Sequence, residues 1–193
     1  MEIILASKSP RRLEILSNLG FFVRVVPSDA DESISEPLSP SDLVRTLAER
    51  KLACDVACNA DDLVIACDTV VCFGGEILGK PKSAEDAKRM LRTLSGKTHS
   101  VFSGLAMRRG GVTISDFERT DVHFRELSDE EIDAYIKSGE PFDKAGSYGI
   151  QGKGGLFAER IDGDYFNVMG LPVHLFGRMF AKITGSEVLC FNA

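Results

Sequence analysis

The chain has 193 residues, of which 44% are hydrophobic and 27% charged, and its formal net charge is −6. These values are typical of a soluble globular protein, and the length fits one domain, spanning 1–193, which can have two lobes. Acidic and basic residues are interspersed and the apolar runs are short, so we expect neither a polynucleotide partner nor a membrane partner.

The cysteines and the N-terminus predict the compartment. None of the five cysteines forms a C-x-x-C pair, and a chain of this length folds without disulfide bonds. Glu2 directly precedes the first apolar run, which leaves no room for a signal peptide. We therefore expect a cytoplasmic protein with reduced thiols at the following positions: Cys54, Cys58, Cys67, Cys72 and Cys190.

The first segment predicts an anion site. A short strand, Ile3–Leu5, leads into a helix that begins with Ser9 as N-cap and Pro10 at its first position. Arg11 and Arg12 then lie at the positive end of the helix dipole, where one cation costs about 0.3–1 kcal/mol. A bound phosphate would remove this cost, whereas the alternative interpretation is two solvated arginines on a surface helix.

The next elements are a strand over 22–26, an acidic loop over 27–40 and a helix from Pro40 to about Ala57. Lys51 follows Leu47 by four residues and therefore lies on the buried face of this helix. Its ammonium group either reaches the edge of that face or points into a cleft.

The rest of the chain predicts an α/β fold with a mixed sheet flanked by helices. Apolar runs, turn residues and helix caps predict these further elements in order: a strand over 63–73, a hairpin turn at Gly74-Gly75 into Ile77-Leu78, a helix from Ser83 to Leu94, strands over 98–107 and 112–124, a helix from Ser128 to Lys137, a glycine-rich segment over 144–155, a hairpin turn at Asp162-Gly163 and a helix from Pro172.

Asp68 is the strongest candidate for chemistry, because it interrupts an apolar strand. An ionised carboxylate there would cost several kcal/mol unless a cation or hydrogen bonds compensate. Such a group can accept a proton or ligate a metal, or it can simply be held by backbone amides at a bend of the strand.

Lys80 ends a sequence that matches the letters of a P-loop, G-x-x-x-x-G-K. Pro81 replaces the Ser or Thr that would bind magnesium, and Ile77-Leu78 has the pattern of a strand, so we reject the P-loop. Lys80 remains a candidate for a single phosphate contact at the end of the hairpin, with a solvated turn lysine as the alternative.

Two weaker candidates complete the set. Glu32 in the acidic loop can be a second metal ligand or a solvated acid, and the segment over 144–155 can be a mobile substrate loop or a merely flexible turn. Within that segment, Gln151 is the side chain able to read a base through paired hydrogen bonds. Several cations, isolated carboxylates and a glycine-rich loop together suit a magnesium–polyphosphate substrate.

The chain resembles the Maf family over nearly its whole length, because the family's motifs occur in order: 6–12 (ASKSPRR), 66–71 (ACDTVV), 79–81 (GKP), 94–96 (LSG), 121–124 (DVHF), 143–152 (DKAGSYGIQG) and 170–172 (GLP). The resemblance implies a nucleoside triphosphate pyrophosphatase that yields a nucleoside monophosphate and pyrophosphate. It also implies an elongated mixed sheet flanked by helices, two lobes with a central cleft, an inosine-triphosphatase-like architecture and a homodimer.

The resemblance also implies roles for residues. Asp68 is expected to accept a proton from water, and Glu32 to join it in holding a divalent cation, which is Mg²⁺, with Mn²⁺ and Co²⁺ as alternatives. Phosphate contacts are expected from Ser7, Arg12, Lys51 and Lys80. Arg11, Thr69 and Gln151 fall where the family sorts substrates, and these residue types resemble the dTTP/UTP branch. The alternatives are a 7-methyl-GTP pyrophosphatase and a nucleotide-binding regulator of cell division with little turnover.

Overall fold

The computed structural model describes residues 1–53 and 58–191, and within these ranges seven strands form one sheet. The strands are β1 (Ile3–Leu5), β2 (Val23–Val25), β3 (Leu63–Phe73), β4 (Glu76–Leu78), β5 (Thr98–Arg109), β6 (Val112–Phe124) and β7 (Ala158–Asp162). Their order is β2-β1-β3-β5-β6-β7, and β4 pairs with β3. Strand β1 is parallel to β2 and β3, whereas β4 and β7 are antiparallel to their neighbours, so the predicted mixed sheet is confirmed.

The helices are α1 (Pro10–Asn18), α2 (Pro40–Ala53), α3 (Ala84–Leu94), α4 (Asp129–Lys137), η1 (Glu140–Asp143), η2 (Ala145–Ser147), η3 (Lys153–Phe157), α5 (Tyr165–Met169), α6 (Val173–Thr184) and α7 (Val188–Phe191). The predicted extension of α2 toward Ala57 lies outside the described residues, and so does Cys54. The described cysteines are free thiols. No helix in the described ranges is long and apolar enough to cross a membrane.

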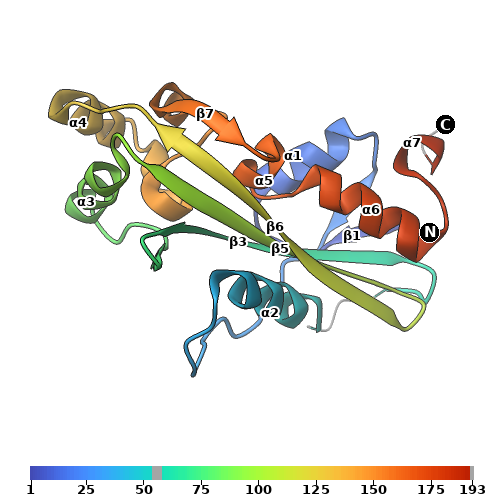
Figure 1. Cartoon of the computed structure of the whole chain (residues 1–193). Helices are drawn as coiled ribbons and strands as arrows, with labels where there is room; N and C mark the ends of the chain where they lie inside the picture. The colour runs from blue at the N-terminus through green and yellow to red at the C-terminus, as the bar shows by residue number, and fades with distance from the viewer. Residues whose placement is uncertain (54–57, 192–193) are drawn as a thin grey trace. The chain divides into compact units, whose positions relative to one another are not determined.

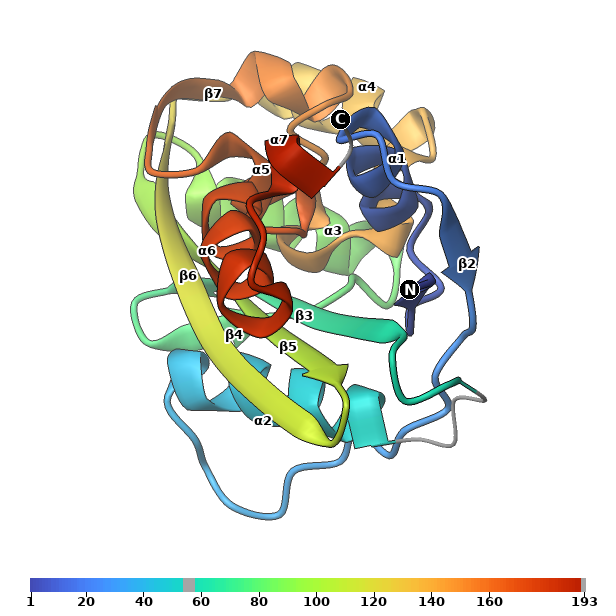
Figure 2. The same ribbon diagram turned by 90° about the vertical axis from the view of Figure 1, so that its right-hand side faces the viewer.

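The chain divides into two compact units, 1–68 with 103–118 and 170–193, and 69–102 with 119–169. In the first unit, α2 covers one face of the sheet and α6 the opposite face (Figures 1 and 2). Small residues allow α2 to approach closely, since a Cβ atom at Gly104 of β5 would lie 2.1 Å from the carbonyl oxygen of Val44.

Alternating residues of β1 and β3 form the core beneath α2. Ile4 and Ala6 share this core with Val64 and Ala66, and Ala48 of α2 packs among them. Side chains along a strand alternate between the two faces of a sheet, and both faces of β1 and β3 are buried. The continuous apolar runs seen in the sequence follow from this double coverage.

The second unit has its own core around α3 and α4. Both helices are capped as predicted: the Ser83 hydroxyl accepts a hydrogen bond from Asp86 N–H, and Ser128 forms a capping box with Glu131. Ion pairs, such as Arg92 with Asp129 at 2.7 Å, join the helices, which lie side by side in Figure 1.

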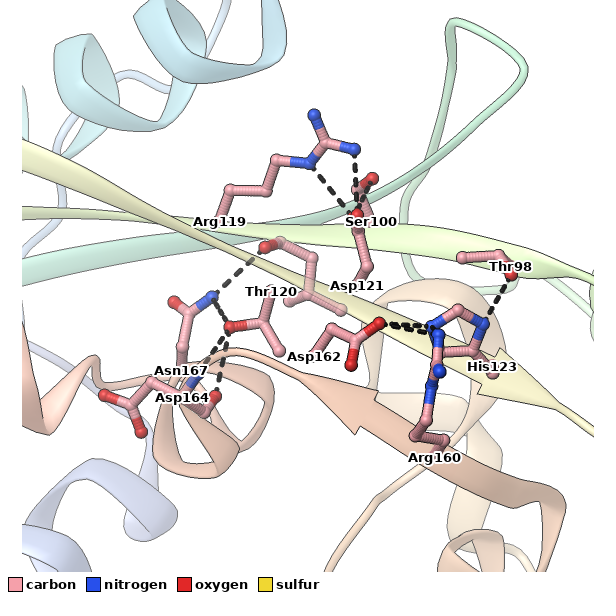
Figure 3. A network of polar contacts seen from close by, with 11 residues as sticks. Thr98, Ser100, Arg119, Thr120, Asp121, His123, Arg160, Asp162, Asp164 and Asn167 are labelled. Carbon is pink, nitrogen blue, oxygen red and sulfur yellow. Dashed lines mark hydrogen bonds and ion pairs between the residues drawn. The ribbon is translucent and has the colours of Figure 1, made fainter.

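The predicted hairpin turn at Asp162-Gly163 is wrong. Strand β7 does end at Asp162, but the chain then enters α5 (Figure 3). Thr120 of β6 causes the change of direction, because its hydroxyl accepts a hydrogen bond from Asp164 N–H and donates one to Asp164 C=O, both at 3.1 Å. Gly163 has φ +131°, and a Cβ atom there would lie 2.8 Å from Thr120 Oγ1, so the close approach requires glycine.

Polar side chains on β5, β6 and β7 are paired with one another (Figure 3). His123 Nδ1 lies 2.7 Å from Thr98 Oγ1, and His123 Nε2 lies 2.9 Å from Asp162 Oδ2, which also accepts from Arg160. These cross-strand side-chain contacts stabilise the edge strand β7 on β6, in the register that their backbone pairing sets.

His99 makes the stability of the second unit depend on pH. Its side chain is buried against the rings of Phe124 and Tyr148, and burial lowers its pKa from 6.5 to about 4, although Asp121 opposes the shift. The unfolded chain therefore binds a proton at a higher pH than the folded chain does. We expect stability to fall as the pH drops from 6.5 to about 4, by up to about 3 kcal/mol from this group.

Urea unfolding of the native protein and of His99→Gln at several pH values tests this expectation. Glutamine does not titrate, so the variant should lose less stability than the native protein between pH 6.5 and 4. Equal losses in the two proteins would contradict the assignment, because all other titrating groups are common to both.

Candidate active site

Helix α1 starts where the sequence predicts it. Ser9 is the N-cap and Pro10 occupies the first helical position, but the Ser9 side chain forms no capping hydrogen bond. The hydroxyl oxygen of Ser7 instead accepts hydrogen bonds from Ser9 N–H at 3.2 Å and from Arg12 Nη1 at 3.0 Å. Ser7 and Arg12 are therefore brought together, and Arg11 lies beside them in the first turn.

Arg12 is fixed by a second contact from the far end of the chain. Its Nε donates to the carbonyl oxygen of Gly170 at 2.8 Å, and the same carbonyl accepts from Cys67 Sγ at 3.2 Å. Cys67 directly precedes Asp68 in β3. The Gly170 carbonyl thus connects the phosphate-binding candidates at α1 with the strand that carries the candidate base.

Lys51 supplies the cation that Asp68 requires. Its Nζ lies 2.5 Å from Asp68 Oδ1 and 2.9 Å from Glu32 Oε1. The side chains of Lys51 and Asp68 are only 13% and 12% exposed, whereas that of Glu32 is 60% exposed. The Lys51 ammonium is therefore largely buried and joins two carboxylates, which excludes the alternative in which it reaches the edge of the helix face.

Arg50 holds the backbone on both sides of Glu32. Its Nη1 donates to the carbonyl oxygen of Ser33 at 2.6 Å and to that of Asp31 at 3.3 Å. The acidic loop is thereby attached to the last turn of α2, which also carries Lys51. This attachment places an exposed loop carboxylate next to the buried pair.

The donor set around Lys51 suits a magnesium ion that is bound together with a polyphosphate. Within residues 1–53 and 58–191, no three His, Cys, Asp or Glu side chains are grouped as a complete metal site. Magnesium is commonly held by one or two carboxylates plus substrate phosphate oxygens, and Asp68 and Glu32 converge on a single ammonium group. Two carboxylates at this spot therefore fit a cation that arrives with its substrate.

The hairpin before Lys80 confirms that this sequence is not a P-loop. Strands β3 and β4 pair in an antiparallel manner across Gly74-Gly75, and the next helix, α3, begins only at Ala84. Lys80 is exposed at the end of this hairpin. The preceding residue, Gly79, accepts a hydrogen bond from Gly146 N–H at 3.1 Å, so the hairpin contacts the glycine-rich segment.

The glycine-rich segment belongs to the second unit. It contains η2 and η3, and Tyr148 is buried with its hydroxyl 2.8 Å from His99 Nε2. Gln151 is exposed in a turn that is closed by a hydrogen bond from Gly152 N–H to Gly149 C=O at 3.1 Å. The structure thus places Lys80 and Gln151 in this unit, and half-buried Thr69 directly follows Asp68 along β3.

Two residues that hold the candidate site together, Arg50 and Gly170, are not predicted as site residues from the sequence. Arg50 and Gly170 act through contacts with the backbone or of the backbone, and such a contact leaves no residue-type pattern in the sequence.

The chain is similar to several known proteins. The Ham1 protein of Staphylococcus aureus has a TM-score of 0.47 at 16% identity, covering 64% of this chain and 72% of that one. A dTTP/UTP pyrophosphatase of Bacillus cereus (strain ATCC 10987 / NRS 248) is 51% identical over 172 residues, which are 89% of this chain and 85% of that protein. A dTTP/UTP pyrophosphatase of Bacillus anthracis is 49% identical, covering 89% and 90%. The model of the family described as Maf-like protein matches residues 2–183, and this chain therefore belongs to the Maf family.

Proposed function

We propose that the protein is a nucleoside triphosphate pyrophosphatase that hydrolyses dTTP and UTP to the monophosphate and pyrophosphate. The observation that carries the proposal is the buried Asp68–Lys51 pair with Glu32 beside it, in a chain about 50% identical to proteins named dTTP/UTP pyrophosphatase. A protein that only binds nucleotides has no need of a buried carboxylate held ready to accept a proton.

In the proposed reaction, Asp68 accepts a proton from the attacking water. Lys51 orients this carboxylate through its short contact, and the opposite charges of the two buried side chains compensate each other. Arg12, Ser7 and the first turn of α1 bind phosphate oxygens and stabilise the negative charge on the departing pyrophosphate.

A divalent cation, Mg²⁺ with Mn²⁺ and Co²⁺ as alternatives, would be held by Asp68 and Glu32. When bound, it would neutralise phosphate charge and lower the pKa of water. We further propose that Lys80 binds phosphate and that Arg11, Thr69 and Gln151 select the base. The family resemblance and the exposed positions of Lys80 and Gln151 support these roles.

The test is incubation of the purified protein with dTTP, UTP, CTP, ITP and 7-methyl-GTP, with and without Mg²⁺. We expect pyrophosphate from dTTP and UTP, and a chelator should stop its release. Release of inorganic phosphate would reject the reaction type, and a preference for 7-methyl-GTP would reject the substrate assignment. Nucleotide binding without any hydrolysis would favour the regulatory alternative. We also propose that the protein forms a homodimer, as the family resemblance implies; elution of a dimer in gel filtration would support this proposal, and elution of a monomer would reject it.

A further inference from the structure

Two side chains that the proposed reaction does not use enclose the turn that carries Gln151. Tyr135 of α4 is buried, and its hydroxyl donates a hydrogen bond to Glu140 Oε1 at 2.9 Å. The same hydroxyl accepts a hydrogen bond from Gly149 N–H at 3.1 Å. Glu140 in turn accepts from Lys153 N–H at 3.1 Å and from Gly154 N–H at 3.3 Å.

These contacts attach both ends of the turn to the same pair of side chains. Gly149 begins the turn and is bound by Tyr135, whereas Lys153 and Gly154 follow it and are bound by Glu140. Gln151 lies between these anchors, with its side chain exposed. A long polar side chain on a free loop would lose much conformational entropy on binding a base, and anchoring the backbone reduces that loss.

The glycines of the turn allow this close fit. A Cβ atom at Gly152 would lie 2.4 Å from Glu140 Oε1, and one at Gly154 would lie 2.8 Å from the Tyr135 hydroxyl. A Cβ atom at either position would displace the Glu140 carboxylate or the Tyr135 hydroxyl, so glycine lets the backbone keep both contacts.

Glu140 remains an acceptor at neutral pH. Burial opposes its ionisation, but the N–H donors of Lys153 and Gly154 and the Tyr135 hydroxyl together hold its pKa below the ordinary value. Lys144 adds a favourable charge nearby, and its Nζ donates to the Glu140 carbonyl oxygen at 2.7 Å. The negative charge of the Glu140 carboxylate is thus compensated by three hydrogen-bond donors and by the nearby Lys144.

We propose that Tyr135 and Glu140 are positioning residues for base selectivity, which hold the Gly149–Gly154 backbone so that Gln151 meets the pyrimidine in one defined position. This inference rests on the proposed function, because it takes Gln151 to be a base contact. A hydrogen-bonding side chain discriminates between ligands only when its supporting shell holds it within about 0.5 Å of the productive geometry.

The test compares Glu140→Gln and Tyr135→Phe with a matched control, Glu159→Gln, which changes an exposed glutamate of β7 in the same unit. The measured quantity is the ratio of kcat/KM for dTTP to that for CTP and for ITP. We expect Glu140→Gln and Tyr135→Phe each to reduce this ratio about tenfold, mainly through a higher KM for dTTP. The control should leave the ratio unchanged.

A double-mutant cycle with Gln151→Ala shows whether the two residues act through Gln151. We expect Glu140→Gln to cause no further loss of selectivity once Gln151 is alanine. A uniform loss for all nucleotides, or selectivity losses that multiply, would overturn the inference in favour of a purely structural role.

Hydrogen exchange separates this inference from the proposed function. We expect the amides of Lys153 and Gly154 to exchange at least tenfold faster in Glu140→Gln than in the native protein, whatever the reaction is. If the native protein releases no pyrophosphate, the proposed function fails, and dissociation constants for dTTP and CTP then replace kcat/KM in the comparison. Unchanged amide exchange in Glu140→Gln, or an unchanged selectivity ratio in both Glu140→Gln and Tyr135→Phe, would reject the positioning role.

Discussion

Asp68→Asn should lower kcat for every hydrolysed nucleotide by about 10²–10⁴-fold, which is the usual contribution of a general base. Asparagine keeps the size of the side chain and can still accept a hydrogen bond from Lys51, but it cannot take a proton from water. Lys51 also keeps its contact with Glu32 at 2.9 Å, so its charge is not left without compensation and the fold should persist. Steady-state release of pyrophosphate measures the effect, and circular dichroism checks the fold.

Asp62→Asn is the matched control, because Asp62 is another buried aspartate and directly precedes β3. Its Oδ1 accepts from Glu2 N–H at 2.8 Å and its Oδ2 from Asn59 N–H at 2.8 Å, and these hydrogen bonds lower its pKa. We expect its replacement to lower thermal stability while kcat stays within about twofold of the native value. Equal loss of turnover in the two variants, or full activity of Asp68→Asn, would show that Asp68 is not the base.

Arg12→Ala should lower kcat/KM about a hundredfold or more for all nucleotides, as expected when a fixed group that stabilises developing charge is removed. The guanidinium is already positioned by Ser7 Oγ at 3.0 Å and Gly170 C=O at 2.8 Å, so it needs little reorganisation when phosphate binds. Arg12→Lys should recover only part of the activity, because an ammonium group cannot reproduce the planar donor arrangement.

Arg11→Ala provides the comparison, since it removes an equal charge from the neighbouring position of the same helix turn. We expect it to change the ranking of dTTP, UTP, CTP and ITP rather than to slow all of them equally. Kinetics with this nucleotide set, together with thermal unfolding of both variants, measure the difference. Equal and uniform losses from the two substitutions would reduce the α1 site to a simple patch of positive charge.

Local patterns were sufficient for most of the fold. The apolar runs of β1 and β3, the serine caps of α3 and α4, and the Gly74-Gly75 turn each act over a few residues, so the sequence displays them directly. The turn at Asp162-Gly163 differs from the predicted hairpin for the opposite reason. Its residue types suit a hairpin, but the direction of the chain depends on Thr120, which lies more than forty positions earlier.

For the candidate site, too, one part can be read from local sequence and the other depends on packing. Asp68 stood out because a charge in an apolar strand needs compensation, and this requirement can be read from one segment. The same segment does not show which cation compensates the charge. Lys51 is 17 residues away, and its position on the helix allows two orientations of the ammonium group. Packing of α2 against the sheet decided between these orientations.

By itself, the sequence determined the family and the mixed α/β class and indicated the candidate site residues, because these follow from motifs and local periodicity. Only the tertiary structure decided which of these residues meet. Arg12 finds its carbonyl partner 158 positions away, and Glu140 binds backbone N–H groups 13 and 14 positions later. Such contacts depend on how separate elements pack, and a backbone partner carries no residue identity that a sequence pattern could display.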